Sequence, residues 1–336
     1  MTMHRQMATV KQILDVVPIP GADNIELARV DGWQSVIKKG QFQKGDKVVF
    51  CEPDSLLPEK PEFEFMRPKK FRIKTCKLRG VVSQGICFPM DILPEDLPVG
   101  TDVSEILGIT KYEPPIPVQL RGLIRCQISR QDAPKTDEMR VQNIPGVLMR
   151  NRGKMFDVTE KIDGTSASYY LDMESGLHVC SRSVDLTRDE ANVYWKYALE
   201  NGIEEVLEAL GENIAIQGEL FGEGIQGNKY KIKGYEYRIF DFWDRQNQRY
   251  VEYETMVDML KEVGLREDFL VPHVGRIELN HGVEDLLKMA DGRSLINGEV
   301  LREGLVFRSI PESIDAELGR LSFKAVSNEF LLKHGE

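Results

Sequence analysis

The sequence predicts an α+β protein in which a small β-barrel precedes a larger domain of antiparallel sheets and flanking helices. Residues 7–108 contain only short β-rich runs separated by turns. Residues 114–117 hold three prolines in four positions. Beyond them, strand-like and helical stretches alternate. A length of 336 residues suits two domains rather than one.

The first part of the chain has the pattern of a closed barrel. Turn signals at Asp31-Gly32 and Gly45-Asp46 interrupt it. Closure of about five short strands removes the exposed sheet edges, which favours a barrel in a segment of this size. The β-rich runs lie at residues 8–17, 25–30, 33–38, 47–51, 71–78 and 85–88.

The proline-rich segment 112–117 is the best linker, because prolines are excluded from helix interiors and central strands. We therefore expect a barrel domain at 1–108, a linker at 109–120 and a second domain at 121–336. Apolar residues at helical spacing lead up to Asn201-Gly202, where a helix should end. The second domain is expected to contain strands at 214–221, 236–243 and 303–309, and helical stretches at 189–210 and 251–263.

The composition is that of an ordinary folded protein, with 41% hydrophobic and 29% charged residues. No apolar run is long enough to span a membrane, and the first seven residues lack the apolar stretch of a secretory signal. The five cysteines never have CxxC spacing, which favours reduced thiols over a zinc site. We expect a cytoplasmic protein without membrane contact.

A net charge of −10 does not exclude nucleic-acid binding, because the charge is unevenly distributed. Between Glu59 and Arg79 the sequence changes from mixed to strongly basic. A local basic stripe can contact phosphates while the remaining surface stays acidic, although a solvated basic strand has the same composition. The candidate phosphate contacts are Lys69, Lys70, Arg72, Lys74, Lys77 and Arg79.

The segment that indicates chemistry is Glu160-Lys161-Ile162-Asp163-Gly164-Thr165-Ser166. A lysine amine, with an ordinary pKa of about 10.4, becomes a nucleophile only when burial, a cation or a metal lowers that value. Asp163 could help to hold a hydrated Mg²⁺, and Gly164 would let the backbone pass close to a nucleotide. By itself this segment could also be a surface lysine before an Asp-Gly turn.

Five further segments follow Lys161 in a fixed order: 181–183 (SRS), 217–222 (QGELFG), 237–242 (YRIFDF), 303–308 (EGLVFR) and 321–325 (LSFKA). Together with the lysine motif, this order resembles that of the covalent nucleotidyltransferases, which include polynucleotide ligases and mRNA capping enzymes. Such an ordered set is very improbable by chance. The resemblance implies an ATP-grasp-like nucleotidyltransferase domain in which Lys161 becomes covalently attached to AMP.

The resemblance also assigns a task to each motif residue. Lys161, Asp163, Glu303 and Lys324 would be catalytic. Glu219 would bind the ribose hydroxyls, and Phe240, which could otherwise be a core residue, would stack on adenine. Contacts with the nucleotide are implied for Lys161, Gly164, Arg182, Glu219, Phe240, Glu303, Arg308 and Lys324, and contacts with the metal for Asp163, Glu219 and Glu303.

Two segments outside these motifs carry further resemblances. Residues 135–143 resemble the segment before the nucleophile in RNA ligases, which makes Arg140 a candidate contact for the β and γ phosphates; a solvated charged turn is the alternative. Residues 8–92, with IPGADNIELARVDGWQSVIKKG, KGDKVVF and RGVVSQG, resemble the OB-fold domain of tRNA-binding modules and synthetase subunits.

The order of the two domains narrows the choice within the superfamily. DNA ligases and capping enzymes usually carry an OB domain after the last motif, whereas here twelve residues follow Lys324 and the barrel comes first. This inverted order resembles RNA ligases of the Deinococcus and Naegleria type. It implies a monomer that uses ATP and Mg²⁺ or Mn²⁺ to join a 3′-OH RNA end to a 5′-phosphate end at nicks in duplexes.

Two positions depart from the pattern of the phage double-strand RNA ligases. Ser166 stands where those enzymes have an asparagine, and Val326 stands where they have a second lysine after Lys324. Arg308 or Lys333 could take over the role of that lysine. Two other functions remain open: a noncatalytic RNA- or tRNA-binding protein with a relic core, and a capping-type guanylyltransferase that uses GTP.

Overall fold

The computed structural model describes residues 5–113 and 118–335. Its N-terminal part is built from short strands that pack around buried apolar clusters. They pair as β1-β5-β9, β2-β3-β4, β7-β8 and β6-β10. The strands are β1 (Ala8–Gln12), β2 (Asp15–Pro18), β3 (Ile25–Val30), β4 (Trp33–Lys38), β5 (Lys47–Cys51), β6 (Ser55–Leu56), β7 (Cys76–Leu78), β8 (Val81–Ser83), β9 (Ile86–Phe88) and β10 (Thr110–Lys111).

Two predicted strand boundaries in this part are wrong. The run 8–17 forms two strands, because Gln12 pairs with β5 whereas Asp15 pairs with β3. The run 71–78 is a strand only from Cys76 onward, because a 3₁₀ helix comes before it and Arg72 is held by Asp54 and lies on the ring of Tyr112. The short helices here are η1 (Pro61–Lys69), η2 (Met90–Ile92) and α1 (Ser104–Leu107).

The second part contains two large sheets. The seven-stranded sheet has the order β11 (Ile124–Gln127), β16 (Val184–Leu186), β15 (Gly176–Cys180), β14 (Thr165–Asp172), β17 (Ile214–Gly222), β18 (Tyr235–Asp244) and β19 (Arg249–Tyr250). The five-stranded sheet has the order β12 (Met139–Arg140), β24 (Ser322–Val326), β21 (Gly304–Ile310), β13 (Met155–Lys161) and β20 (His273–Glu278). All neighbouring strands in both sheets are antiparallel except β12 and β24. A separate ribbon joins β22 (Ile314–Asp315) and β23 (Gly319–Arg320).

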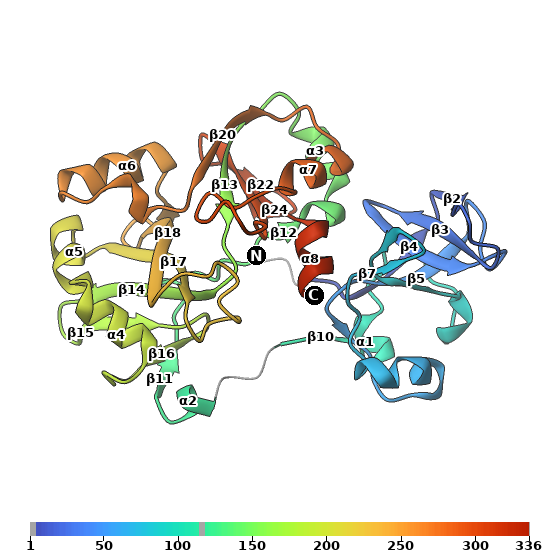
Figure 1. Cartoon of the computed structure of the whole chain (residues 1–336), viewed down its shortest axis with the longest axis horizontal. Coiled ribbons are helices and arrows are strands. Elements are labelled where there is room, and N and C mark those ends of the chain that lie inside the picture. The colour runs from blue at the N-terminus through green and yellow to red at the C-terminus, as the bar shows by residue number, and fades with distance from the viewer. Residues whose placement is uncertain (1–4, 114–117, 336) are drawn as a thin grey trace.

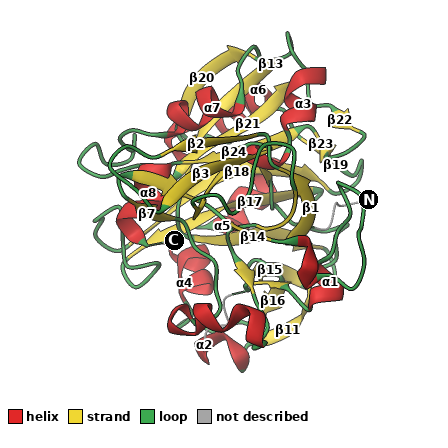
Figure 2. Ribbon diagram, turned by 90° about the vertical axis from the view of Figure 1, so that its right-hand side faces the viewer, coloured by secondary structure: helices red, strands yellow, loops and turns green. Residues whose placement is uncertain are grey.

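Helices flank both sheets, as predicted (Figures 1 and 2). The expected helix at 189–210 is two helices, because Gly202 takes a positive φ of 59° between them. These helices bury apolar side chains in the core of the seven-stranded sheet, and α7 packs in the core of the other sheet. The remaining helices are α2 (Val118–Arg121), α3 (Pro145–Arg150), α4 (Val193–Glu200), α5 (Ile203–Leu210), α6 (Tyr253–Glu262), α7 (Val283–Ala290), α8 (Asn328–His334), η3 (Val141–Asn143) and η4 (Glu267–Phe269).

The chain crosses from one sheet to the other immediately after Lys161. This residue is the last of β13 in the five-stranded sheet, and Thr165 is the first of β14 in the seven-stranded sheet. A Cβ on Gly164 would lie 2.4 Å from the carbonyl oxygen of Leu220. Glycine is therefore required here for the close approach of the turn to β17.

The barrel contacts the five-stranded sheet through β12 and η3. Trp33 Nε1 donates to Asn143 Oδ1 at 2.6 Å, and Asp54 Oδ2 accepts from Arg140 Nη2 at 3.0 Å. The backbone N–H of Gly32 donates to the carbonyl of Gln142 at 3.2 Å. In Figure 1 the barrel lies beside the two-sheet part, with α8 on the side of the sheets that faces it.

The linker prediction falls partly outside the described residues, which omit 114–117. On the barrel side, Thr110 and Lys111 of β10 still pair with β6, so strand pairing extends beyond the expected boundary at 108. All five cysteines lie in the described part and are free thiols, as expected. Among the described residues, no helix is both long and apolar enough to cross a membrane.

Candidate active site

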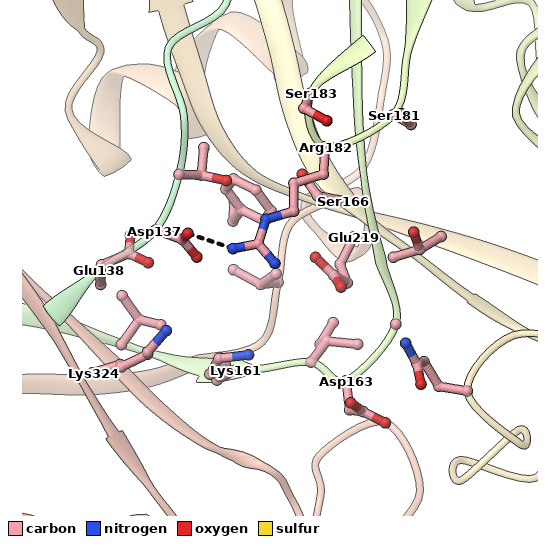
Figure 3. Close-up of a pocket in the computed structure, with 18 of the residues that line it drawn as sticks. Asp137, Glu138, Lys161, Asp163, Ser166, Ser181, Arg182, Ser183, Glu219 and Lys324 are labelled. Atoms are coloured by element: carbon pink, nitrogen blue, oxygen red, sulfur yellow. Dashed lines mark hydrogen bonds and ion pairs between the residues drawn. The ribbon is translucent and has the colours of Figure 1, made fainter. Parts of the chain in front are cut away.

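A cavity of about 590 Å³ lies between the two sheets and contains most of the side chains singled out in the sequence (Figure 3). This volume is within the usual range for small-molecule sites, roughly 300–1,000 Å³. Both sheets contribute to its walls. The predicted site residues that line it are Lys161, Asp163, Gly164, Arg182, Glu219, Phe240, Arg308 and Lys324.

Strand register places the cations of the five-stranded sheet on one face. Residues directly opposite in antiparallel strands point to the same side, as do residues two apart along a strand. Val306 is opposite both Lys324 and Thr159, and Thr159 is two residues before Lys161. Lys161 and Lys324 therefore both project into the cavity, as Figure 3 shows.

The ammonium of Lys161 is bound by carboxylate. Its Nζ lies 2.7 Å from Glu303 Oε2. Burial alone would lower the pKa of Lys161, but the charges of Glu303, Glu219 and Asp163 outweigh it and raise that pKa well above its ordinary value. These carboxylates therefore favour the protonated amine, and Lys161 needs additional positive charge nearby before it can act as a nucleophile.

The pKa of Lys324 is shifted in the opposite direction. Burial and the adjacent charge of Lys161 lower it to about 8, although Asp137 and Glu138 oppose the change. Such a desolvated ammonium interacts strongly with any anion that enters the cavity.

The three predicted metal-binding carboxylates surround Lys161. Burial, together with the charges of Glu303 and Asp163, raises the pKa of Glu219 to about 8, and burial also raises that of Glu303. This accumulation of negative charge suits a divalent cation. Among the described residues, however, no three His, Cys, Asp or Glu side chains form a group that could hold an ion. Asp163, Glu219 and Glu303 therefore do not form a preformed set of direct metal ligands.

Asp137 and Glu138 line the cavity but were not predicted as site residues from the sequence. Asp137 pairs with Arg182, and Glu138 lies next to it in the wall (Figure 3). Burial would raise the pKa of Asp137, but Lys324, Arg182 and Lys111 lower it overall. The sequence did contain a signal for them, because both acids lie in the segment 135–143 that resembles RNA ligases. From that segment only Arg140 was predicted to be a site residue.

Arg308 and Phe240 line the cavity from opposite sheets. Arg308 is buried and already paired: its Nε lies 3.2 Å from Asp241 Oδ1, and its Nη1 donates to Thr159 Oγ1 at 3.1 Å. Its charge is therefore largely neutralised before any phosphate arrives.

Arg140 does not line the cavity. Its guanidinium is mostly shielded from solvent and donates to Asp54 of the barrel, so Arg140 is not part of a solvated charged turn. A contact of Arg140 with the β and γ phosphates stays a prediction. The sequence could not show that the barrel supplies a carboxylate for this arginine. Lys333 is exposed on α8 and Val326 is buried, so neither adds a cation to the cavity wall.

Another contact was not anticipated from the sequence. Lys229, in the loop between β17 and β18, places its Nζ 2.8 Å from Asp163 Oδ2. The next residue, Tyr230, accepts a hydrogen bond from the backbone N–H of Asp163 at 3.0 Å. The only sequence signal was a lysine-rich loop between two predicted strands.

Comparison with known proteins agrees with both halves of the chain. A model of an OB-fold domain matches residues 7–90, and the RNA ligase family model matches residues 154–326. A segment of 118 residues, 30% of this chain, is 31% identical to the β subunit of phenylalanine–tRNA ligase from Neisseria meningitidis. The chain spans only 14% of that subunit's length.

Solved structures of an RNA ligase from Naegleria gruberi are similar over nearly the whole chain. A mutant with ATP and manganese has a TM-score of 0.87 and 39% identity, covering 98% of this chain and 99% of the other. A form with pyrophosphate has a TM-score of 0.87 and 39% identity, covering 99% of each chain. Another mutant with AMP and manganese has a TM-score of 0.88.

The matched family, the inverted domain order and the lysine-containing cavity agree with one another. ATP and a divalent metal ion are the cofactors that the related structures support, and the substrate is nucleic acid. This chain belongs to the RNA ligase family and is an ATP-dependent RNA ligase with an N-terminal OB-fold domain.

Proposed function

We propose that this ligase seals nicks in duplexes, joining a strand with an RNA 3′-OH to a 5′-phosphate through a lysyl-AMP and an adenylylated 5′ end. The observation that carries the proposal is the placement of Lys161, paired with Glu303, in the wall of the cavity that Lys324 and Arg182 also line. An amine held in this way can attack the α-phosphorus of ATP once its proton is lost.

In the first step the Nζ–P bond forms as the bond from the α-phosphorus to pyrophosphate breaks. Lys324, whose ammonium is desolvated, would bind the phosphate oxygens on which charge develops. Glu219 would accept hydrogen bonds from the ribose hydroxyls, and Phe240 would stack on adenine. A divalent cation, when bound, supplies positive charge that favours the neutral amine of Lys161.

The three carboxylates around Lys161 suit a hydrated divalent cation. Asp163, Glu219 and Glu303 lie around Lys161 and repel one another, but they do not form a group that holds a bare ion. Mg²⁺ usually keeps several water molecules and uses few protein ligands. We therefore propose that these carboxylates contact the ion through its water.

In the second and third steps the AMP passes to a 5′-phosphate, and the 3′-OH then displaces AMP. Arg182, which is partly exposed at the cavity, would bind the 5′-phosphate. On the barrel, Lys69, Lys70, Lys77 and Arg79 are exposed and available to phosphates. Arg72 and Lys74 are engaged instead, with Asp54 and with the carbonyl of Gly335 respectively.

A panel of nicked duplexes tests the proposal, with RNA or DNA on each side of the nick and opposite it. Labelled ATP should leave AMP on the denatured protein, and Lys161→Ala should abolish both this label and sealing. Lys154→Ala, at an exposed lysine just before β13, should retain both. We expect sealing when the nucleotides at the 3′-OH side of the nick are RNA. We also expect light scattering to show that the enzyme is a monomer.

The two alternatives give different results in the same assay. A relic core would bind RNA equally well with or without Lys161 and would never become labelled. A capping-type enzyme would be labelled by GTP in preference to ATP. Efficient sealing of single strands but not of nicked duplexes would contradict the duplex substrate while leaving ligation intact.

A further inference from the structure

The loop formed by residues 223–234, between β17 and β18, contacts the turn that follows the nucleophile. Lys229 and Tyr230 do not line the cavity, yet both bind Asp163. One contact is with the carboxylate, at 2.8 Å, and the other is with the backbone N–H, at 3.0 Å. The loop therefore restrains Asp163 at two points.

The loop itself is anchored. The amide of Asn228 donates to the carbonyl of Ile232 at 2.8 Å and accepts from the N–H of Ile232 at 3.1 Å. The carbonyl of Tyr230 accepts from Asn297 Nδ2 at 3.0 Å, and the buried ring of Tyr230 packs edge-on against Phe221. The backbone from which the Lys229 side chain projects is therefore held in place.

The position of Lys229 differs from that of the other two lysines in the loop. Its side chain is only 13% exposed, and its Nζ lies 5.0 Å from the ring centroid of Phe330 on α8. Lys231 and Lys233 are exposed. The ammonium of Lys229 thus lies between an aromatic face, which favours cations, and one carboxylate at the edge of the cavity.

The ion pair with Lys229 has a clear physical effect at this point. Asp163 carries the same charge as Glu219 and Glu303, which also act on Lys161, and like charges repel one another. On a short turn, the Asp163 side chain could rotate away from the two others. An ion pair that is mostly shielded from water opposes this rotation more strongly than an exposed pair would.

We propose that Lys229 is a positioning residue for AMP transfer, which holds the Asp163 carboxylate in the orientation in which it acts beside Lys161. This inference rests on the proposed function. Because Lys229 acts through Asp163 and not on the nucleotide, its loss should slow the transfer of AMP without weakening the binding of ATP.

The test compares Lys229→Met, Lys229→Arg and a matched control, Lys233→Met, in the full-length protein. Single-turnover formation of lysyl-AMP is measured over a range of ATP concentrations, with thermal unfolding recorded alongside. Loss of a residue that orients a site carboxylate typically costs about 10- to 100-fold in activity. We expect a loss of this size in the maximal rate of Lys229→Met, with an unchanged half-saturating ATP concentration.

Lys229→Arg keeps the charge and should retain most of the rate, and Lys233→Met should match the wild type. A wild-type rate in Lys229→Met overturns the inference, and so does a loss confined to ATP binding. If Lys229→Met does not fold, Lys229→Gln replaces it and must show the same loss of maximal rate. Failure of the wild type to form lysyl-AMP would instead overturn the proposed function.

Discussion

At the scale of single residues, the chemistry of Lys161 depends on its neighbours. Its motif suggests a nucleophile, but the structure shows an ammonium bound to Glu303, with a pKa raised by the carboxylates around it. Activation requires a change in local charge, which is consistent with an enzyme that uses a divalent ion.

Glu303→Gln should make Lys161 more reactive toward a simple amine-directed reagent when no metal or ATP is present. Burial already favours the neutral amine, and removing the Glu303 charge removes a main cause that raises the pKa of Lys161. At pH 8 a larger fraction of the amine is then unprotonated. Peptide mass spectrometry should show faster labelling of Lys161 in the variant.

The exposed Lys154 serves as an internal control and should be labelled equally in both proteins. Equal labelling of Lys161 in the wild type and in Glu303→Gln would mean that Glu303 does not control its protonation. The same variant should nevertheless be a poor ligase, because Glu303 is proposed to act on the metal.

At the scale of elements, the turn between β13 and β14 brings the two sheets together at the nucleophile. Gly164→Ala would place a methyl group 2.4 Å from the carbonyl oxygen of Leu220. Overpacking of this kind typically costs about 1–3 kcal/mol. We expect a lower free energy of unfolding in urea and a lower rate of lysyl-AMP formation.

Gly298→Ala is the matched substitution, because a Cβ at that position meets nothing within 4 Å. It should leave stability and rate close to those of the wild type. Wild-type stability in Gly164→Ala would show that the turn can shift, and that the close approach is not required.

Elements were predicted well where one face or both faces are buried in a regular pattern. The strands at 25–30, 33–38 and 47–51 have the predicted bounds. The prediction of a strand over 71–78 was wrong for residues 71–75, where a distant residue binds a side chain: Arg72 is paired with Asp54. Strand propensity is local, and it cannot include such a partner.

At the scale of the whole molecule, Asp54 couples the barrel to the catalytic sheets. It accepts from Arg72 at 2.9 Å and from Arg140 at 3.0 Å. Burial would raise the pKa of Asp54, but Arg140, Arg72 and Arg5 lower it overall. The stability from these contacts is therefore present above the ordinary pKa of aspartate and is lost as the pH falls through the lowered value.

Asp54→Asn should leave the buried Arg140 without its charged partner. Breaking a buried pair in this way costs about 3–5 kcal/mol. We expect a lower unfolding midpoint in urea at pH 7 and a larger radius of gyration in solution scattering, since the barrel is held less firmly. At a pH low enough to protonate Asp54, the difference from the wild type should shrink.

Arg29→Ala provides the comparison, because its ion pair with Glu284 also joins the barrel to the sheets but is exposed. An exposed pair contributes about 0–1 kcal/mol, so this variant should behave almost like the wild type. Equal effects of the two substitutions would contradict a special role for Asp54.

The sequence alone determined the fold class, the domain order and the membership of Lys161 in a nucleotidyltransferase motif, because these depend on local pattern and on the order of short segments. Tertiary structure decided the partners of each charge. Arg140 turned toward Asp54, Asp137 toward Arg182 and Asp163 toward Lys229. Electrostatic pairing depends on distances between segments far apart in the chain, and those distances exist only once the sheets and the barrel have packed.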